Sequence, residues 1–374
     1  MALSEQDRKR LDQLFEYLDR EAATFLGYPC SGLFDYAPLY RLLRYPVNNV
    51  GDPFVSTTFR LNTHEIEIEV IRFFAGLFHA PADGYWGYVT NGGTEGNLYG
   101  LFLGRELFPD GIVYFSEDTH YSVPKLLRLL GLKSIMIRSL PSGAMDGEDL
   151  EESLRLHREV PAIIVANIGT TMKGAQDDVR RILHSLDAAT QRRHYIHCDA
   201  ALHGMILPFL DGAPEFDFRL PVDSLAVSGH KMIGSPIPCG VVLARRQNVD
   251  RIARSVEYVG TLDTTISGSR NGVTPVFLWY AIRTLGMEGF RAMVGGCLEV
   301  AAYAERRLGE AGLRAWKNPF SNIVVFDRPP EAVAHKWSLA LQRDIAHLIA
   351  MPHVTVEKVD RLVKEILEAR GAGS

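Results

Sequence analysis

Short apolar runs alternate with amphipathic segments through the middle of the chain, and this alternation constrains the fold most. Helical spacing is found at residues 98–107, 121–130, 147–156 and 177–189. The apolar runs predict strands at residues 86–90, 111–115, 134–138, 161–166, 195–198, 224–227 and 240–244. Repeated β–α units indicate an α/β domain with a mostly parallel sheet. Ligands of such sheets bind beyond the carboxyl ends of the strands.

Side chains capable of chemistry follow five of these strands, namely Thr94, His120, Thr171, Asp199 and Lys231. A nucleophilic lysine needs a lowered pKa, which burial or neighbouring cations supply. His230 and the apolar pair Met232 and Ile233 could create such surroundings for Lys231. Taken alone, that stretch is explained equally well by an ordinary surface lysine after a strand. The placement of all five side chains directly after strands favours a functional site.

A glycine-rich stretch, residues 90–97 (TNGGTEGN), joins the first strand to the next helix. Backbone N–H groups and the helix dipole at such a junction attract anions, and Thr94 can add a hydroxyl. The stretch is neither a Walker loop nor a GxGxxG fingerprint, so nucleoside phosphates are not specifically indicated. The alternative is a plain turn with a threonine cap.

Residues 194–203 contain His194, His197, Cys198, Asp199 and His203, which raises the possibility of a metal site. Strand alternation places His197 and Asp199 on one face and Cys198 on the other, so three ligands do not converge. No metal is therefore predicted. A buried carboxylate at Asp199 is better explained as the partner of a buried cation.

Composition excludes several classes of protein. A net charge of -5 over 374 residues disfavours nucleic acid and anionic membranes as partners. The apolar runs are shorter than the roughly 18 residues that span a bilayer, and the first ten residues lack a signal peptide's apolar core. The four cysteines are scattered without CxxC spacing, as expected for reduced thiols in a cytoplasmic protein.

The flanking regions predict additional structure. Residues 5–25 form an amphipathic helix, 27–62 an irregular stretch rich in aromatics and amides, and 64–79 a second helix. Residues 245–272 are expected to be a mobile loop followed by a polar turn. A long helix over 276–308, interrupted near 286–289, leads to a strand at 322–326 and to helices at 332–342 and 356–369. We therefore expect an N-terminal segment (1–62), a large domain (63–285) and a small C-terminal α+β domain (286–374).

The assembled motifs resemble those of group II pyridoxal-phosphate-dependent amino-acid decarboxylases, nearest to bacterial histidine decarboxylases and plant serine decarboxylases. They are residues 90–97, THYS at 119–122, NIGTT at 167–171, HCDAA at 197–201 and SGHKMIGSPIPCG at 228–240. The resemblance covers nearly the whole chain. It implies the aspartate aminotransferase-like fold (fold type I), with a mostly parallel seven-stranded sheet, and pyridoxal 5'-phosphate as cofactor.

The resemblance also assigns roles around the cofactor ring. Lys231 is expected to form the Schiff base with the cofactor aldehyde, and Asp199 to pair with the pyridinium nitrogen. His120 is expected to stack on one ring face, with the methyl group of Ala201 on the other. Thr171 is expected near the ring hydroxyl. A carboxylate at the nitrogen keeps it protonated, so that the ring can accept the electrons left when CO2 departs.

The phosphate is expected to bind Gly93 and Thr94, helped by Ser228 and His230. For the proton returned to the α-carbon, relatives often use a tyrosine on a mobile loop. Tyr258 is therefore the first candidate donor and His120 the second, although a tyrosine that only packs would explain position 258 as well.

The substrate is expected to be an amino acid, and the resemblance leaves its identity open. Asn62 and Thr63 match the histidine enzymes, whereas residues 49–54 and 344–348 are closer to the serine enzymes. We rank L-histidine, giving histamine, first, L-serine, giving ethanolamine, second, and another small or polar amino acid third. An aminotransferase and a non-catalytic cofactor-binding homologue are the remaining alternatives. A homodimer with the active site at the subunit interface is expected, in which the 267–270 turn could reach a neighbour's phosphate.

Overall fold

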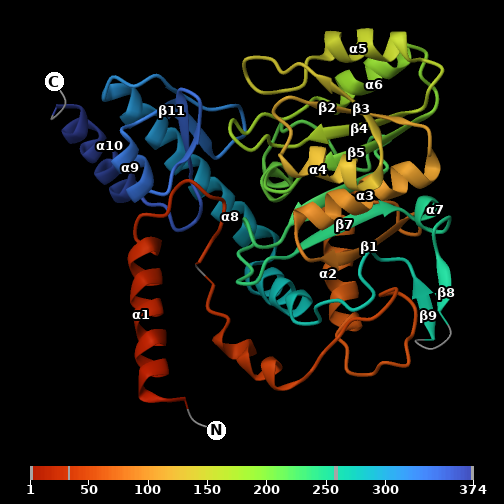
Figure 1. Ribbon diagram of the computed structural model, residues 1–374, viewed down its shortest axis with the longest axis horizontal. Helices are drawn as coiled ribbons and strands as arrows, with labels where there is room; N and C mark the ends of the chain where they lie inside the picture. Colours follow the sequence, from red (N-terminus) through yellow and green to blue (C-terminus); the bar gives the residue numbers. More distant parts are fainter. Residues whose placement is uncertain (1–2, 33, 257–259, 372–374) are drawn as a thin grey trace. The chain divides into compact units, whose positions relative to one another are not determined.

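The computed structural model describes residues 3–32, 34–256 and 260–371, which divide into two compact units (Figure 1). The larger unit comprises residues 30–296 and 318–321, and the smaller one comprises residues 1–29, 297–317 and 322–374. All of the predicted strand-end residues that the structure describes belong to the larger unit.

A seven-stranded sheet in the order β1-β7-β6-β5-β4-β2-β3 forms the centre of the larger unit. Only β7 runs antiparallel to its neighbours. The strands are β1 (Tyr85–Thr90), β2 (Ile112–Ser116), β3 (Lys133–Ile137), β4 (Ala162–Asn167), β5 (His194–Asp199), β6 (Ser224–Ser228) and β7 (Gly240–Arg245). The predicted fold class is confirmed, and six of these strands are fully or almost fully buried, as their continuous apolar runs require.

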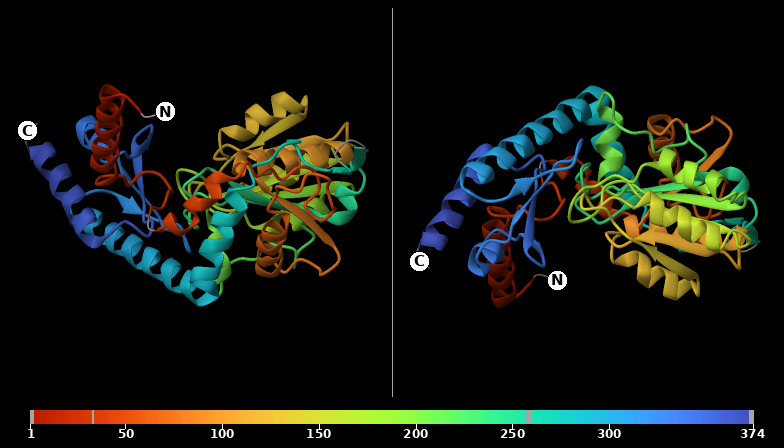
Figure 2. Two further views of the ribbon diagram at one scale, coloured as in Figure 1. Left: turned by 90° about the horizontal axis from the view of Figure 1, so that it is seen from below. Right: turned by 90° about the horizontal axis from the view of Figure 1, so that it is seen from above.

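Helices cover both faces of this sheet (Figure 2). They are α2 (His64–Leu77), α3 (Gly93–Leu107), α4 (Ser122–Leu130), α5 (Gly147–Leu156), α6 (Val179–Ala188) and the short α7 (Arg246–Val249). Ala226 of β6 lies against Gly96 of α3, whereas its neighbour Val227 lies near Phe78, directly after α2. Successive strand residues point to opposite faces, so α2 and α3 cover opposite sides.

Shorter elements complete the larger unit. They are three 3-10 helices, η1 (Ala37–Arg44), η2 (His203–Met205) and η3 (Leu207–Phe209), and two strands, β8 (Arg254–Val256) and β9 (Thr261–Asp263). Strands β8 and β9 pair antiparallel within the stretch predicted as a loop. Three-residue strands leave too little periodicity to be recognised from sequence.

The smaller unit has a four-stranded antiparallel sheet in the order β10-β11-β13-β12. Its elements are α1 (Glu5–Ala22), β10 (Ala315–Trp316), β11 (Ile323–Asp327), α9 (Glu331–Lys336), β12 (Ala340–Gln342), β13 (Ile345–Ile349) and α10 (Val356–Gly371). Helix α8 (Thr274–Glu310) includes residues of both units and is interrupted at Gly286, as predicted.

The helix predicted over residues 332–342 is wrong in its second half. Helix α9 ends at Lys336, and Ser338 has a φ of 48°, which is incompatible with a continuing helix. Residues 340–342 then pair with β13. Sheet pairing overrides the local helical pattern here. In the part of the chain that the structure describes, no helix is long and apolar enough to cross a membrane.

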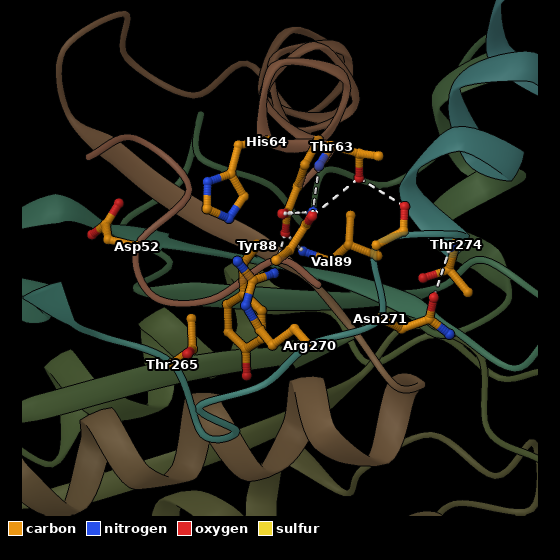
Figure 3. Close-up of polar contacts among 12 residues, drawn as sticks. Asp52, Thr63, His64, Tyr88, Val89, Thr265, Arg270, Asn271 and Thr274 are labelled. Carbon is orange, nitrogen blue, oxygen red and sulfur yellow. Dashed lines mark hydrogen bonds and ion pairs between the residues drawn. The ribbon is translucent and has the colours of Figure 1, made fainter. Parts of the chain in front are cut away.

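A buried ion pair between Glu67 and Arg270 joins the irregular N-terminal stretch to the large sheet. Figure 3 shows Arg270 beside the ring of Tyr88. The Arg270 guanidinium donates to Glu67 Oε1 and to the Gly51 carbonyl, 3.0 Å away. Glu67 also accepts from the Val89 N–H at 2.9 Å and from Asn49 Nδ2 at 2.7 Å. One carboxylate thus connects residues 49–51 and residue 270 to strand β1.

The expectation that the 267–270 turn could reach a neighbour's phosphate stays a prediction, and the pairing shows that the Arg270 side chain of this turn is directed into its own chain. The Arg270 side chain is only 2% exposed and lies over the Tyr88 ring, 5.3 Å from its centroid. A charge desolvated this far needs its partner nearby, so Arg270 serves the interior of its own chain.

Replacing Arg270 by methionine is expected to destabilise the protein by about 3–5 kcal/mol, because it leaves the Glu67 carboxylate buried without a counter-ion. Urea unfolding of the two proteins measures the difference. The double variant Glu67→Gln/Arg270→Met is expected to recover part of the loss, since no charge then remains buried.

Arg283→Met provides the matched control. Arg283 pairs with Glu69, on the same helix as Glu67, but the two side chains are 63% and 40% exposed. Exposed pairs contribute about 1 kcal/mol or less. Equal losses in the two single variants would show that burial of the Glu67–Arg270 pair is not important for stability.

Candidate active site

The strand-end residues predicted from sequence meet at one edge of the large sheet. Asp199 is the last residue of β5, and its register partners are Asn167 at the end of β4 and Ala226 in β6. Lys231 follows β6 by three residues, and His120 follows β2. Because these strands are parallel, their carboxyl ends lie together.

Lys231 has the surroundings that a nucleophilic amine requires. Its side chain keeps partial exposure, yet burial lowers its pKa, while the nearby charges of Asp199 and Cys30 oppose the shift. A lowered pKa increases the fraction of neutral amine at neutral pH. The structure therefore favours the reactive lysine over the ordinary surface lysine.

His120 lies close enough to interact electrostatically with both Asp199 and Lys231. Burial lowers its pKa, the Asp199 carboxylate raises it, and Lys231 and Lys125 lower it. Its Nδ1 accepts from the Ser122 N–H at 3.3 Å and lies 2.7 Å from the Ser122 hydroxyl. In the neutral ring the hydrogen is therefore on Nε2.

Two hydrogen bonds hold the Asp199 carboxylate. Asn97 Nδ2 donates to Oδ2 at 2.7 Å, and the Ala201 N–H donates to Oδ1 at 3.2 Å. Asp199 is 8% exposed, so the carboxylate is nearly removed from water. Its orientation is therefore fixed by the protein.

Helix α3 begins at Gly93, directly after Gly92, whose φ of 143° favours glycine. A Cβ at position 93 would lie 2.6 Å from Ser228 Oγ and 3.5 Å from the Ala201 Cβ. A Cβ at position 92 would lie 3.9 Å from Cε1 of His230. The N-terminus of α3 thus lies beside Ser228 and His230, and this group, here called the anion cradle, suits an anion.

The remaining predicted residues are placed as follows. Thr94 and Thr171 have exposed side chains, on the first turn of α3 and on the loop after β4. The Ala201 carbonyl accepts from the Ser228 N–H at 3.0 Å, and His230 Nδ1 lies 2.9 Å from the Cys239 carbonyl. Tyr258 lies outside the described residues.

Sequence reasoning assigned no role in this site to three residues near the cluster. Cys30 interacts electrostatically with Lys231, although more than 200 residues separate them in sequence. Asn97 and His197 share a hydrogen bond of 3.0 Å on the sheet side of α3. The one available signal was His197, two residues before Asp199 and so on the same strand face.

The family model described as "Pyridoxal-dependent decarboxylase conserved domain" matches residues 105–314. The chain is 46% identical to a histidine decarboxylase of Mesorhizobium japonicum, with 97% of this chain and 98% of that protein aligned. It is 47% identical to a histidine decarboxylase of Morganella morganii, over 98% of each chain. Serine decarboxylase 2 of Oryza sativa subsp. japonica is 44% identical over 95% of this chain and 76% of its own length.

Solved structures of decarboxylases are also similar to this chain. L-methionine decarboxylase from Streptomyces sp.590 superimposes with a TM-score of 0.91 at 27% identity, covering 98% of this chain and 95% of that chain. Glutamate decarboxylase of Lactobacillus brevis has a TM-score of 0.81 at 17% identity, which supports the fold alone. A strand-end lysine, a carboxylate beside it and an anion cradle on this fold suit pyridoxal 5'-phosphate. The chain belongs to the pyridoxal-dependent decarboxylase family.

Proposed function

We propose that the protein decarboxylates L-histidine to histamine and CO2 with pyridoxal 5'-phosphate as cofactor. The observation that carries this proposal is the amine of Lys231, whose pKa is lowered beside the Asp199 carboxylate at the sheet edge. The choice of L-histidine rests on the histidine decarboxylases that are 46% and 47% identical over nearly the full length of both chains.

The residues present fit this cofactor. A side chain at position 93 would collide with Ser228, so glycine leaves room there for a phosphate beside the helix N-terminus. Lys231 would bind the aldehyde carbon, and Asp199 would receive the ring nitrogen. His120 would lie on the ring face and Thr171 near the ring hydroxyl, with Thr94, Ser228 and His230 completing the phosphate site.

When bound, the cofactor supplies an electron sink for the bond that breaks as CO2 leaves. The protein's contribution is to hold charges and protons in place. Asp199, held by Asn97 and the Ala201 N–H, would keep a positive charge at the ring nitrogen. Lys231 can act as a nucleophile because its amine loses its proton more readily than an exposed lysine.

A general acid must return a proton to the substrate's α-carbon. We propose Tyr258 first and His120 second. The neutral His120 ring carries its hydrogen on Nε2, because Nδ1 accepts from the Ser122 N–H, and this supports His120 as a donor.

L-serine is the second candidate substrate. The supporting observation is the 44% identity to Serine decarboxylase 2 of Oryza sativa subsp. japonica. An imidazole and a hydroxymethyl group differ in volume and in hydrogen bonding, so a site built for one discriminates against the other.

We further propose that the protein acts as a homodimer. Helix α1 buries none of its residues within the chain, and it exposes 41% of Leu11, 47% of Leu14, 58% of Phe15 and 49% of Leu18. An apolar stripe of this kind suits a second copy of the chain. Thr94 and Thr171 are exposed at the candidate site, which leaves room for a neighbouring subunit to complete it.

Incubation with a panel of L-amino acids, scoring amine and CO2 for each, tests the reaction. Histidine is expected to turn over fastest. Lys231→Ala is expected to lower kcat more than about a thousandfold, because it removes the nucleophile. It should also remove the visible absorbance band of the bound cofactor.

Lys364→Ala is the matched control, because the Lys364 side chain is 75% exposed on α10 and its loss should change neither readout. Faster turnover of serine than of histidine would reverse the substrate order. A keto-acid product without CO2 would identify an aminotransferase, and cofactor binding without any turnover would indicate a non-catalytic homologue.

The double variant Leu14→Glu/Leu18→Glu is expected to raise the dimer dissociation constant more than about tenfold, since burying each leucine contributes about 1.5–3 kcal/mol. Sedimentation velocity across a concentration series measures the effect. Leu156→Glu, at a leucine that is 75% exposed on α5, is the control. An unchanged dimer in the α1 variant would exclude this face as the interface.

A further inference from the structure

A chain of buried hydrogen bonds ends at the Asp199 carboxylate. Tyr195 donates its hydroxyl to Ser224 Oγ at 2.7 Å, and Ser224 Oγ lies 2.8 Å from His197 Nδ1. His197 Nε2 lies 3.0 Å from Asn97 Oδ1, and Asn97 Nδ2 donates to Asp199 Oδ2 at 2.7 Å. The first four residues are at most 2% exposed.

The donor and the acceptor of every hydrogen bond in this series follow from its last residue, Asp199. A carboxylate only accepts, so the Asn97 amide group must turn its NH2 to Asp199 and its oxygen to His197. That oxygen needs a donor, so the His197 hydrogen lies on Nε2 and the bare Nδ1 accepts from Ser224. All donors therefore point towards Asp199.

Asp199 is the only charged member of this series of hydrogen-bonded residues. Burial lowers the pKa of His197 to about 4, although the Asp199 carboxylate opposes the shift, so the ring is neutral at neutral pH. Aligned neutral dipoles orient and stabilise a carboxylate without cancelling its charge, and bonds to a charged acceptor are about twice as strong as neutral ones. Asp199 thus keeps its charge for a further partner.

Two glycines allow helix α3 to approach closely enough for this contact. A Cβ at Gly96 would lie 2.7 Å from the Cβ of Ala226, and one at Gly100 would lie 2.2 Å from His197 Nδ1. Glycine is unfavourable inside a helix. Its presence on both sides of Asn97 shows that close approach of this helix to β5 and β6 is built into the sequence.

We propose that Asn97 and His197 are positioning residues, which hold the Asp199 carboxylate directed at the pyridine nitrogen of the cofactor, so that this nitrogen stays protonated. The inference rests on the proposed function for the identity of the cofactor. It assigns Asn97, on the second turn of α3, a role distinct from the anion cradle at the first turn. Without this support the Asp199 carboxylate is free to turn away from the ring nitrogen, and the ring becomes a weaker electron sink.

The test uses the holoenzyme loaded with 15N-labelled pyridoxal phosphate, whose nitrogen chemical shift reports protonation directly. In Asn97→Leu, of similar volume but without the donor, the nitrogen is expected to lose its proton about one pH unit lower than in the wild type. A one-unit change corresponds to about a tenfold change in the protonation equilibrium. We expect kcat to fall by about tenfold and KM to stay within about twofold.

His197 provides a pair of variants. His197→Phe removes the donor to Asn97 and is expected to move the nitrogen titration in the same direction. His197→Gln keeps a side-chain N–H and is expected to restore most of the wild-type titration. Asn97→Ala replaces Asn97→Leu if the latter fails to fold.

Ser185→Ala separates positioning from simple stability. Ser185 is fully buried and donates to the Gly147 carbonyl at 3.1 Å, away from the site. This variant is expected to lower the melting temperature without moving the nitrogen titration. If the cofactor nitrogen titrates in both Asn97→Leu and His197→Phe as it does in the wild type, the inference is overturned. Release of CO2 would then still support the proposed function. If the titration of the nitrogen shifts as expected but the protein decarboxylates no amino acid, the proposed function is overturned and the inference stands.

Discussion

The negative charge of Asp199, at the end of a buried strand, is the constraint on which the rest of the site depends. A carboxylate in this position is costly unless every lone pair finds a donor or a cation. The Ala201 N–H and the Asn97 amide satisfy part of that need, and both are neutral. The remaining attraction acts on Lys231 and His120.

The protein treats another buried carboxylate, that of Glu67, differently. Glu67, fully buried, is neutralised within the chain by the Arg270 guanidinium. Glu67 therefore has a structural role and joins the 49–51 segment to strand β1, whereas the hydrogen-bond donors to Asp199 are both neutral.

The sequence predicted the parts of this protein that depend on local periodicity. Strands of the large sheet lie within about two residues of their expected bounds, because continuous apolar runs end where the buried strands end. The helix predicted at 332–342 failed because β13 supplies partners for residues 340–342, which no local pattern reveals. The Glu67–Arg270 pair was not predicted for the same reason, since the two residues lie about 200 positions apart in the sequence.

The Asn97–His197 contact marks the limit of such prediction and also explains the shape of the site. It joins residues about 100 positions apart and exists only because Gly96 and Gly100 let α3 lie on the sheet. The same helix presents its first turn to the anion cradle and its second turn to Asp199. A phosphate bound at Gly93 and a ring nitrogen bound at Asp199 would therefore both be positioned by α3. The position of this helix would set the distance between the two ends of the cofactor site.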